Sequence, residues 1–357
     1  MPESSLTLRA GPRALERIRR EGFTPAMVGH IGAAAGGPKW MILDRLDRAL
    51  FGTWFRDHTQ PVIAVGASIG GWRLACAAQR DPVAAIQRFE DAYLAQAYAA
   101  DAGPADVSRE AWRILAAVLG ERGAGEVLAH PWLRLNVVAA RTKGWIGSST
   151  PSLEALGYAG ALLANAVSRR RLAGHVERVL LHVPDGALRA QPDGFVTHHA
   201  PLTTDNLPFA LMASASIPGV MPPVRDIPGA PPGPYIDGGM IDYHMDLPLP
   251  PADDGRIAFL PHFSERVVTG WLDKFLPWRR AQNLDGTLVL APSPALLARL
   301  PGGRIPDRRD FSRYKGRDAE RIAAWKGAIG EGQRMADEFL ELARTERFAA
   351  AVRPLVP

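Results

Sequence analysis

The residue in this sequence best placed to do chemistry is a serine between two glycines. Ser68 lies in the run Gly66-Ala67-Ser68-Ile69-Gly70, which has the G-x-S-x-G spacing. An apolar run rich in β-branched residues, 61–65, comes just before it and predicts a short buried strand, and helix formers follow to about residue 79. Strand, serine and helix in this order are typical of a nucleophile elbow, in which the glycines permit a strained turn and close packing.

A second glycine-rich run, 32–40, precedes this elbow and contains Gly36-Gly37-Pro38-Lys39. It follows a strand expected at 27–31, and apolar residues at helical spacing resume at Ile42. Neither G-x-x-x-x-G-K-[ST] nor G-x-G-x-x-G is present, which argues against a nucleotide site. We expect this run to form an oxyanion hole, in which backbone N–H groups stabilise charge on an acyl oxygen. Because Pro38 has no N–H, the donors would be Gly36, Gly37 or Lys39, with Ile69 across the site.

An aspartate far along the chain, Asp237, is a candidate partner for Ser68. It ends a short apolar run and is followed by Gly238 and Gly239. A carboxylate beside a serine hydroxyl can take its proton during attack on an ester carbonyl and later return one to the leaving alcohol. This chemistry requires the fold to bring the two side chains together.

A histidine base is the alternative chemistry. In α/β-hydrolases the chain order is serine, then acid, then histidine, and His244 and His262 both follow Asp237. His198 and His199 are further candidates. Asp242, His244 and Asp246 alternate along the chain as metal ligands on one strand face could. This spacing is not specific for a metal site, and we interpret the three residues as a polar rim. No metal is therefore expected at the site.

Three blocks, in this order, resemble the patatin-like phospholipases. Gly36-Gly37-Pro38-Lys39 is similar to the family's G-G-x-[RK] loop, Gly66–Gly70 to its G-x-S-x-G, and Asp237-Gly238-Gly239 to its D-G-G. The small-residue stretch 213–223, before a proline-rich loop, also resembles the family. Within it we interpret Ser214 and Ser216 as packing residues. The resemblance covers roughly residues 26–260.

The resemblance implies a three-layer α/β sandwich and a Ser–Asp dyad that hydrolyses acyl esters of lipids, with no cofactor. Two residues depart from the family pattern: Ala35 stands where many members have glycine, and Trp40 replaces a glycine after the basic residue. Trp40 would narrow the acyl entrance, and Lys39 would either bind an anionic head group or hold the loop. The neighbours of the dyad are expected to contact substrate: Trp40, Gly70, Gly238 and Gly239.

Composition sets the class of protein. The chain has 357 residues, 47% hydrophobic and 22% charged, which is ordinary for a globular protein. The net charge of +5 is mild and comes with no nucleic-acid motif, so we expect no nucleic-acid partner. The single cysteine, Cys76, excludes an internal disulfide framework. The first nine residues lack the apolar core of a signal peptide, and the longest apolar stretch is too short to span a bilayer, so we expect a cytoplasmic protein.

Two successive strand–helix units predict a largely parallel sheet covered by helices. We expect one domain over 1–357, with a catalytic core at about 26–262 and helical, basic additions over 263–357. The sequence predicts helices at 11–21, 81–99, 107–119 and 153–171, and one ending near 347. It predicts strands at 134–140, 257–260 and 287–290, and a hairpin from 178–183 and 195–199.

The segment 271–280 mixes aromatic and basic residues and is a candidate for peripheral membrane contact. Three aromatic side chains would insert into a lipid surface: Trp271, Phe275 and Trp278. Arg279 and Arg280 would lie near its anionic head groups.

Three functions remain open. The first is a lipid acyl hydrolase, the second an esterase, thioesterase or acyltransferase on non-membrane substrates, and the third a catalytically silent lipid-binding protein.

Overall fold

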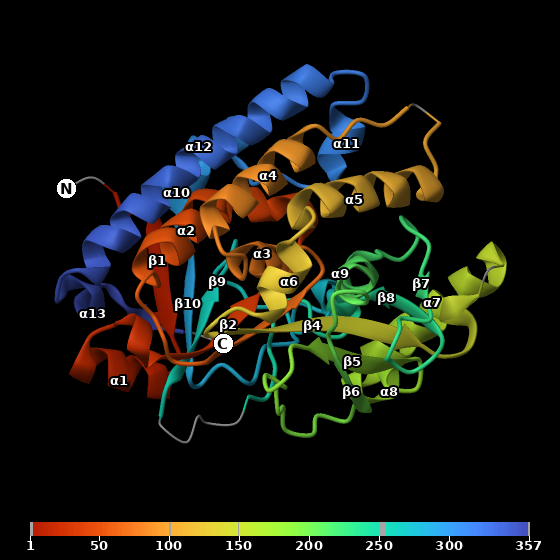
Figure 1. The fold of residues 1–357 in the computed structure, drawn as a ribbon, viewed down its shortest axis with the longest axis horizontal. Coiled ribbons are helices and arrows are strands. Elements are labelled where there is room, and N and C mark those ends of the chain that lie inside the picture. Colours follow the sequence, from red (N-terminus) through yellow and green to blue (C-terminus); the bar gives the residue numbers. More distant parts are fainter. Residues whose placement is uncertain (1–2, 100, 149, 250–254, 356–357) are drawn as a thin grey trace.

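A computed structural model describes residues 3–99, 101–148, 150–249 and 255–355. It is a mixed α/β fold built on a central, mostly parallel sheet flanked by helices (Figure 1). Nine strands follow the order β11-β1-β10-β9-β2-β3-β4-β5-β6, and β8 pairs with β4 and β7. The bounds are β1 Leu6–Ala10, β2 Val28–Ala33, β3 Val62–Ala67, β4 Leu133–Thr142, β5 Val176–His182, β6 Thr197–Pro201, β7 Val224–Arg225, β8 Pro234–Asp237, β9 Ile257–Pro261, β10 Thr287–Pro292 and β11 Arg353–Pro354.

The five strands β10, β9, β2, β3 and β4 are parallel and form the centre of the sheet. Pairing is antiparallel where β1 joins β10, and where β5 and β8 join β4. Strands from both ends of the chain share this sheet, because β1 lies between β10 and β11. Central strands such as β3 are buried on both faces, as expected for parallel strands that need a cover on each side.

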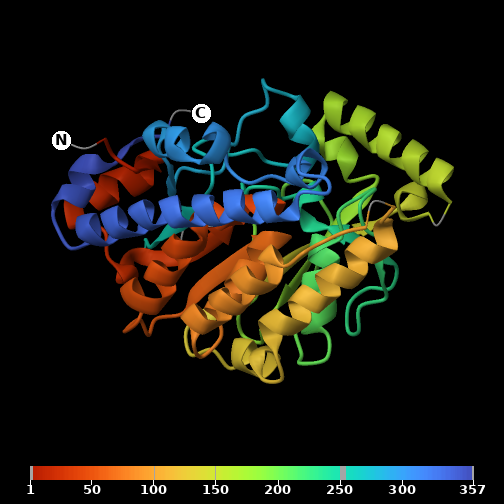
Figure 2. The same ribbon diagram turned by 90° about the horizontal axis from the view of Figure 1, so that it is seen from above.

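Helices cover one face of the sheet (Figures 1 and 2), among them α2 Asp44–Ala49, α3 Ile69–Ala77, α4 Pro82–Leu94, α5 Pro104–Leu119 and α12 Asp318–Ala343. The other face is covered in part by irregular chain from 243–249 and 267–284, which packs on Val65, Val138 and Leu180. At one end of the molecule lie α7 Pro151–Val167 and α8 Arg169–Leu172. The remaining helices are α1 Pro12–Glu21, α6 Gly123–Leu128, α9 Leu207–Ala215, α10 Pro294–Arg299, α11 Arg309–Arg313 and α13 Arg347–Ala351.

Most of the expected elements are present, with corrections at particular places. The hairpin prediction is wrong, because β5 and β6 run parallel. The connecting loop does not turn back on itself but crosses over, where the Leu188 amide donates to Asn136 and the Gln191 amide to the Pro248 carbonyl. A parallel pair needs such a crossover. The helix expected to 99 ends at Leu94, and the one expected over 153–171 divides at Ser168 into α7 and α8.

Candidate active site

The turn between β3 and α3 holds Ser68 in a strained backbone conformation. Its φ of 55° and ψ of −132° lie where residues with a side chain are rare. The flanking glycines allow this turn to pack: a Cβ on Gly70 would lie 2.0 Å from the Ala33 carbonyl oxygen, and one on Gly66 would lie 2.7 Å from the Gly70 carbonyl carbon. The serine thus follows a strand and opens a helix, which is the geometry that exposes a nucleophile.

The register of three strands brings Asp237 beside Ser68. Ala67, the last residue of β3, is opposite Val138 of β4, so Ser68 lies at the level of Ala139. The other edge of β4 is taken by β5, where Ala139 is opposite Val179, so β8 continues along the same edge as β3. On that edge Ala139 pairs with Asp237, the last residue of β8, and Ser68 and Asp237 therefore lie next to each other beside the same residue of β4.

Hydrogen bonds from the segment 213–218 fix the backbones of both residues. The Ser214 hydroxyl accepts from the Ser68 N–H at 2.8 Å and donates to the Val138 carbonyl at 2.6 Å. The Asp237 N–H donates to the Ser216 carbonyl at 2.9 Å. We interpreted both serines as packing residues from the sequence. Ser214 instead positions the candidate nucleophile, a role for which the run of small residues is the sequence signal.

The Ser68 hydroxyl lies close enough to the Asp237 carboxylate to lower the pKa of that carboxyl. Asp237 Oδ1 accepts a hydrogen bond from the Gly239 N–H at 2.7 Å. Burial raises the pKa of Asp237 from 3.8 to about 6, against the opposing effects of the Ser68 hydroxyl, the Gly239 bond and the nearby Arg308 and Lys274 charges. A carboxylate with this pKa is ionised above pH 6 and is a better proton acceptor than an ordinary aspartate.

Four expected oxyanion-hole residues line the same cavity as Ser68: Gly36, Gly37, Lys39 and Ile69. Ile69 is the first residue of α3, and such an N–H has no carbonyl partner within its helix. Gly37 has a φ of +56°, and a Cβ on Gly36 would lie 2.6 Å from the Phe263 ring, so this loop needs both glycines. The Lys39 ammonium lies 3.7 Å from Asp307 and 5.1 Å from the centre of the Phe263 ring.

Among the four neighbours expected to contact substrate, only Gly239 lines this cavity. Trp40 is 1% exposed and stacks on Phe89 with ring centres 4.1 Å apart, so its side chain lies in the core below α4. Gly70 and Gly238 are close-packing positions, since a Cβ on Gly238 would lie 2.0 Å from the Val138 carbonyl oxygen. We therefore assign no substrate contact to Trp40, Gly70 or Gly238.

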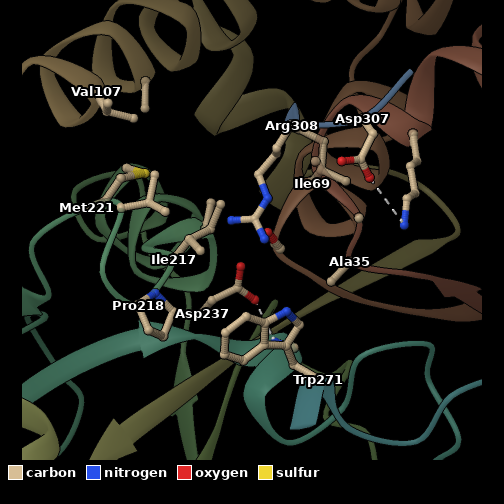
Figure 3. A pocket seen from close by; sticks show the side chains of 18 of the residues that line it. Ala35, Ile69, Val107, Ile217, Pro218, Met221, Asp237, Trp271, Asp307 and Arg308 are labelled. Atoms are coloured by element: carbon tan, nitrogen blue, oxygen red, sulfur yellow. Dashed lines mark hydrogen bonds and ion pairs between the residues drawn. The ribbon is translucent and has the colours of Figure 1, made fainter. Parts of the chain in front are cut away.

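The cavity above Ser68 has a volume of about 760 Å³ and two kinds of wall (Figure 3). One wall is apolar and comes mainly from α5 and the loop after α9, with Val107, Ile114, Ile217 and Met221. The other carries charges from the loop after β2, the turn at 271–275 and the segment before α11, with Lys39, Lys274, Asp307 and Arg308. Ser68 and Asp237 lie between the two walls, so an acyl chain and a polar group could both be accommodated.

Residues 41–253 match the family model described as patatin-like phospholipase, which is more than half of the chain. The chain belongs to this family. The matched range contains Ser68 and Asp237 and begins directly after the Gly36–Trp40 stretch. No curated protein and no solved structure matches the chain. The family acts on lipids as acyl hydrolases, and none of the helices in the described ranges is long and apolar enough to cross a membrane.

In this patatin-like chain the four candidate histidines make their contacts elsewhere. His244 and His262 are buried with ring centres 4.3 Å apart, and burial first, then the neighbouring cations, lowers the pKa of both, to about 3 for His262. Nδ1 of His244 accepts from the Val268 N–H at 3.0 Å. His198 bonds Glu177 at 2.9 Å, and His199 faces His182. Since Asp237 lines the cavity beside Ser68 and none of these four histidines does, the geometry favours an aspartate over a histidine as its base.

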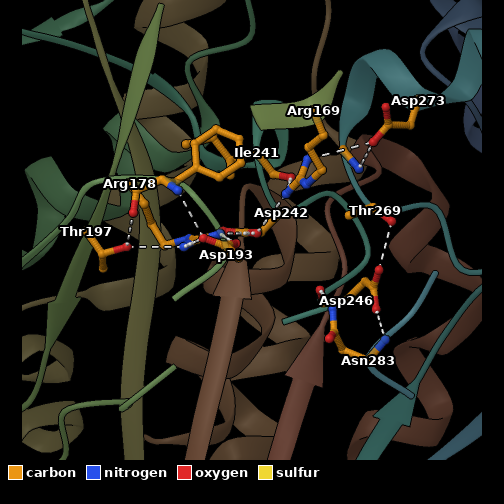
Figure 4. Close-up of polar contacts among 12 residues, drawn as sticks. Arg169, Arg178, Asp193, Thr197, Ile241, Asp242, Asp246, Thr269, Asp273 and Asn283 are labelled. Carbon is orange, nitrogen blue, oxygen red and sulfur yellow. Dashed lines mark hydrogen bonds and ion pairs between the residues drawn. The ribbon is translucent and has the colours of Figure 1, made fainter. Parts of the chain in front are cut away.

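Asp242 and Asp246 do not form the polar rim expected from the sequence, because each is buried in a hydrogen-bond network (Figure 4). Arg178 holds Asp242 through two bonds, at 2.6 and 2.9 Å, and also holds Asp193. Asp246 accepts from the Thr269 hydroxyl and from the amides of Gln282 and Asn283. These networks anchor the chain after Asp237 and the chain that carries Lys274, and so they hold both in place around the cavity.

Proposed function

We propose that this protein is a lipid acyl hydrolase that cleaves carboxylic esters through an acyl-enzyme on Ser68, with Asp237 as the base. The observation that carries the proposal is that Ser68 and Asp237 lie side by side at the same residue of β4 and line one cavity that has an apolar wall. The raised pKa of Asp237, about 6, suits a base that must accept a proton near neutral pH.

The reaction divides into two steps of the same kind. Ser68 Oγ attacks the ester carbonyl carbon while its proton passes to the Asp237 carboxylate, and amides of Gly36, Gly37 or Lys39 with Ile69 receive the oxyanion. Collapse of this intermediate breaks the bond to the alcohol, which leaves with the proton from Asp237. Water then attacks the acyl-enzyme, gives its proton to Asp237, and releases the fatty acid and free Ser68. Loss of one oxyanion donor typically costs about 10²–10³ in kcat.

Labelling with a fluorophosphonate tests the nucleophile directly. We expect a covalent adduct on Ser68 in the folded protein and none in the Ser68→Ala variant. An Asp237→Asn variant should label far more slowly, because it lacks the base. Failure of the folded protein to label would overturn the proposal and favour a silent lipid-binding protein.

Substrate profiling separates the hydrolase from the second candidate, an esterase, thioesterase or acyltransferase on non-membrane substrates. The apolar wall of the cavity favours long acyl chains, so we expect glycerophospholipid and long-chain esters to be cleaved faster than acetyl esters or acyl thioesters. Transfer of the acyl group to an added alcohol in preference to water would instead favour the acyltransferase.

We also propose that the turn at 271–278 contacts a lipid surface. Phe275 and Trp278 are 64% and 69% exposed, whereas Trp271 lines the cavity, so the exposed aromatics stand near its mouth. The turn packs against α7, which exposes apolar side chains of its own, including Leu156, Leu163 and Val167. Of the two arginines, Arg279 bonds Asp273 at 2.9 Å and has a structural role. Arg280 is exposed, and we propose it as the head-group contact.

Sedimentation with vesicles containing an anionic phospholipid tests this surface. Removing the two exposed aromatics by Phe275→Ser with Trp278→Ser should weaken vesicle binding by about tenfold or more, since burial of one such side chain contributes roughly 1.5–3 kcal/mol. Hydrolysis of a short soluble ester should change little. Val83→Ser, at a half-exposed site on α4, is the matched control. Equal loss of vesicle binding and ester hydrolysis would mean that the turn is structural.

A further inference from the structure

The charged wall of the cavity carries more cations than carboxylates. Four basic residues line the cavity, Lys39, Lys274, Arg308 and Arg309, against two acidic ones, Asp237 and Asp307. All four basic residues and Asp307 lie outside the range that matches the family model, and Lys39 precedes that range by two positions. We propose that Arg308 and Lys274, with Lys39, bind a phosphate group on the alcohol side of the substrate, so that the preferred esters are acyl lipids with a phosphate close to the scissile bond.

Arg308 is the central residue of this site. Figure 3 shows its guanidinium pointing into the cavity above the Asp237 carboxylate, and its charge lowers the pKa of Asp237. The aliphatic stem is held against the oxyanion loop, because a Cβ on Gly37 would lie 3.3 Å from Arg308 Cγ. The guanidinium thus lies next to the place where the ester reacts.

Two neighbouring arginines have a structural role, in contrast to Arg308. Arg304 and Arg313 bind the buried Asp310 at 2.6 and 2.5 Å, and these pairs fix the turn into α11. Within the described ranges, Arg308 takes part in no ion pair of this kind. A guanidinium at the wall of a cavity with its donors uncommitted is suited to a planar or tetrahedral anion, which it can bind through two parallel bonds.

Lys274 adds a further cation to the charged wall, from the turn at 271–275. Its ammonium lies 4.5 Å from the centre of the Tyr243 ring and 5.2 Å from that of Trp271, and it donates to the Tyr243 hydroxyl at 3.5 Å. The residue is exposed at the cavity mouth, yet the walls around the ammonium desolvate it. Together with repulsion from Lys39 and Arg308, this lowers the pKa of Lys274 to about 7. A bound anion would relieve that repulsion.

The position of the cations relative to the dyad gives the substrate class, and this step rests on the proposed function. With the acyl chain against Val107 and Met221 and the carbonyl oxygen at the amides, the alcohol side faces Arg308 and Lys274. A phosphate separated from the ester by a few atoms, as in a monoacylglycerol phosphate, would reach both. A neutral head group would leave the repulsion among the cations in place.

Binding of non-hydrolysable ligands to the Ser68→Ala variant tests the site without turnover. We expect octyl phosphate to bind at least about tenfold more tightly than octyl glucoside, because charge-assisted hydrogen bonds contribute roughly 1.5–3 kcal/mol. Inorganic phosphate should bind more weakly than octyl phosphate. Arg308→Gln and Lys274→Gln should each remove most of the preference for octyl phosphate, whereas Arg299→Gln, which removes an arginine paired with Glu331 outside the cavity lining, should retain it.

Equal affinity for octyl phosphate and octyl glucoside would overturn the proposal, and so would an equal effect of Arg299→Gln. Inorganic phosphate binding as tightly as octyl phosphate would also overturn it, since the anion site would then be independent of the acyl wall. Thermal unfolding of each variant checks that it is folded. Fluorophosphonate labelling fails if the proposed function is wrong, and the binding preference fails if the phosphate site is wrong, so the two failures are distinguishable.

Discussion

Replacement of Asp237 by asparagine should make the protein more stable at neutral pH while it abolishes hydrolysis. The ionised carboxylate is buried, and burial is the largest influence on its raised pKa. Asparagine has the same shape, can accept from the Gly239 N–H, and can donate to Ser68. It therefore keeps the local hydrogen bonds and removes the cost of a desolvated charge.

The size of the effect follows from the two pKa values, 3.8 for an unperturbed aspartate and about 6 for Asp237. Because the folded state binds the proton more tightly, the free energy of unfolding falls as pH rises between these values and is level above them. Relative to a chain without this titration, the free energy of unfolding of the wild type is lower by about 1.6 kcal/mol at pH 5 and by about 3 kcal/mol at pH 8. The free energy of unfolding of Asp237→Asn relative to the wild type should therefore rise by about 1.4 kcal/mol from pH 5 to pH 8.

Urea unfolding of both proteins at pH 5 and pH 8 measures this growth. Any pH-independent difference in how asparagine packs cancels when the two pH values are subtracted. The control is Asp205→Asn, at an exposed position, which should show no comparable growth. An advantage that stays constant or shrinks as pH rises would refute the claim that a destabilising charge is buried beside Ser68.

Three further predictions concern the base and its supports. The kcat/KM for a neutral soluble ester should rise with pH through about 6 and then level off, because Asp237 must be ionised; a flat profile from pH 5 to 8 would exclude it as the base. Ser214→Ala should cost roughly 1–3 kcal/mol of stability and lower kcat, since it leaves the buried Ser68 N–H unpaired. The control is Ser216→Ala, which removes a hydroxyl that bonds only the Met212 carbonyl and should leave kcat unchanged. Equal losses of kcat in the two variants would contradict this role of Ser214. Arg178→Met should cost about 3–5 kcal/mol in urea unfolding because the buried Asp242 loses its two-bond partner and keeps the longer ion pair with Arg169 at 3.6 Å, and a loss below 1 kcal/mol would contradict the burial of that pair.

The parts of the site that depend on local sequence could be predicted, and those that depend on distant pairing could not. Ser68 has all its signals within about ten residues: a strand, two glycines and a helix. The contact of Ser68 with Asp237 depends on β8 lying antiparallel to β4, which no local pattern specifies. The expected role of Asp237 therefore came from the motif resemblance. The hydrogen bond from Ser68 to Ser214 spans 146 positions and has no local signal beyond small residues.

The errors have the same origin. Trp40 is next to the oxyanion loop in sequence, but the helical turn at Gly37–Leu43 directs its side chain toward Phe89 and away from the cavity. The strand β1 alternates buried and half-buried residues over five positions, too short a run to predict, and it is buried only because β10 and β11 from the far end of the chain lie on either side. Proximity in sequence gives the neighbourhood of a residue and leaves the direction of its side chain undetermined.

The proposed chemistry and the proposed selectivity come from different parts of the chain. Ser68, Asp237 and the supporting Ser214 all lie within the range that matches the family, whereas Lys274 and Arg308 follow it. The later segment is nevertheless held by its own buried contacts, Asp273 with Asn165 and Asp310 with Trp325, which do not involve the dyad. Substitution of Arg308 or Lys274 can therefore alter which alcohol is preferred without disturbing the nucleophile, and the two proposals can be tested in the same protein one at a time.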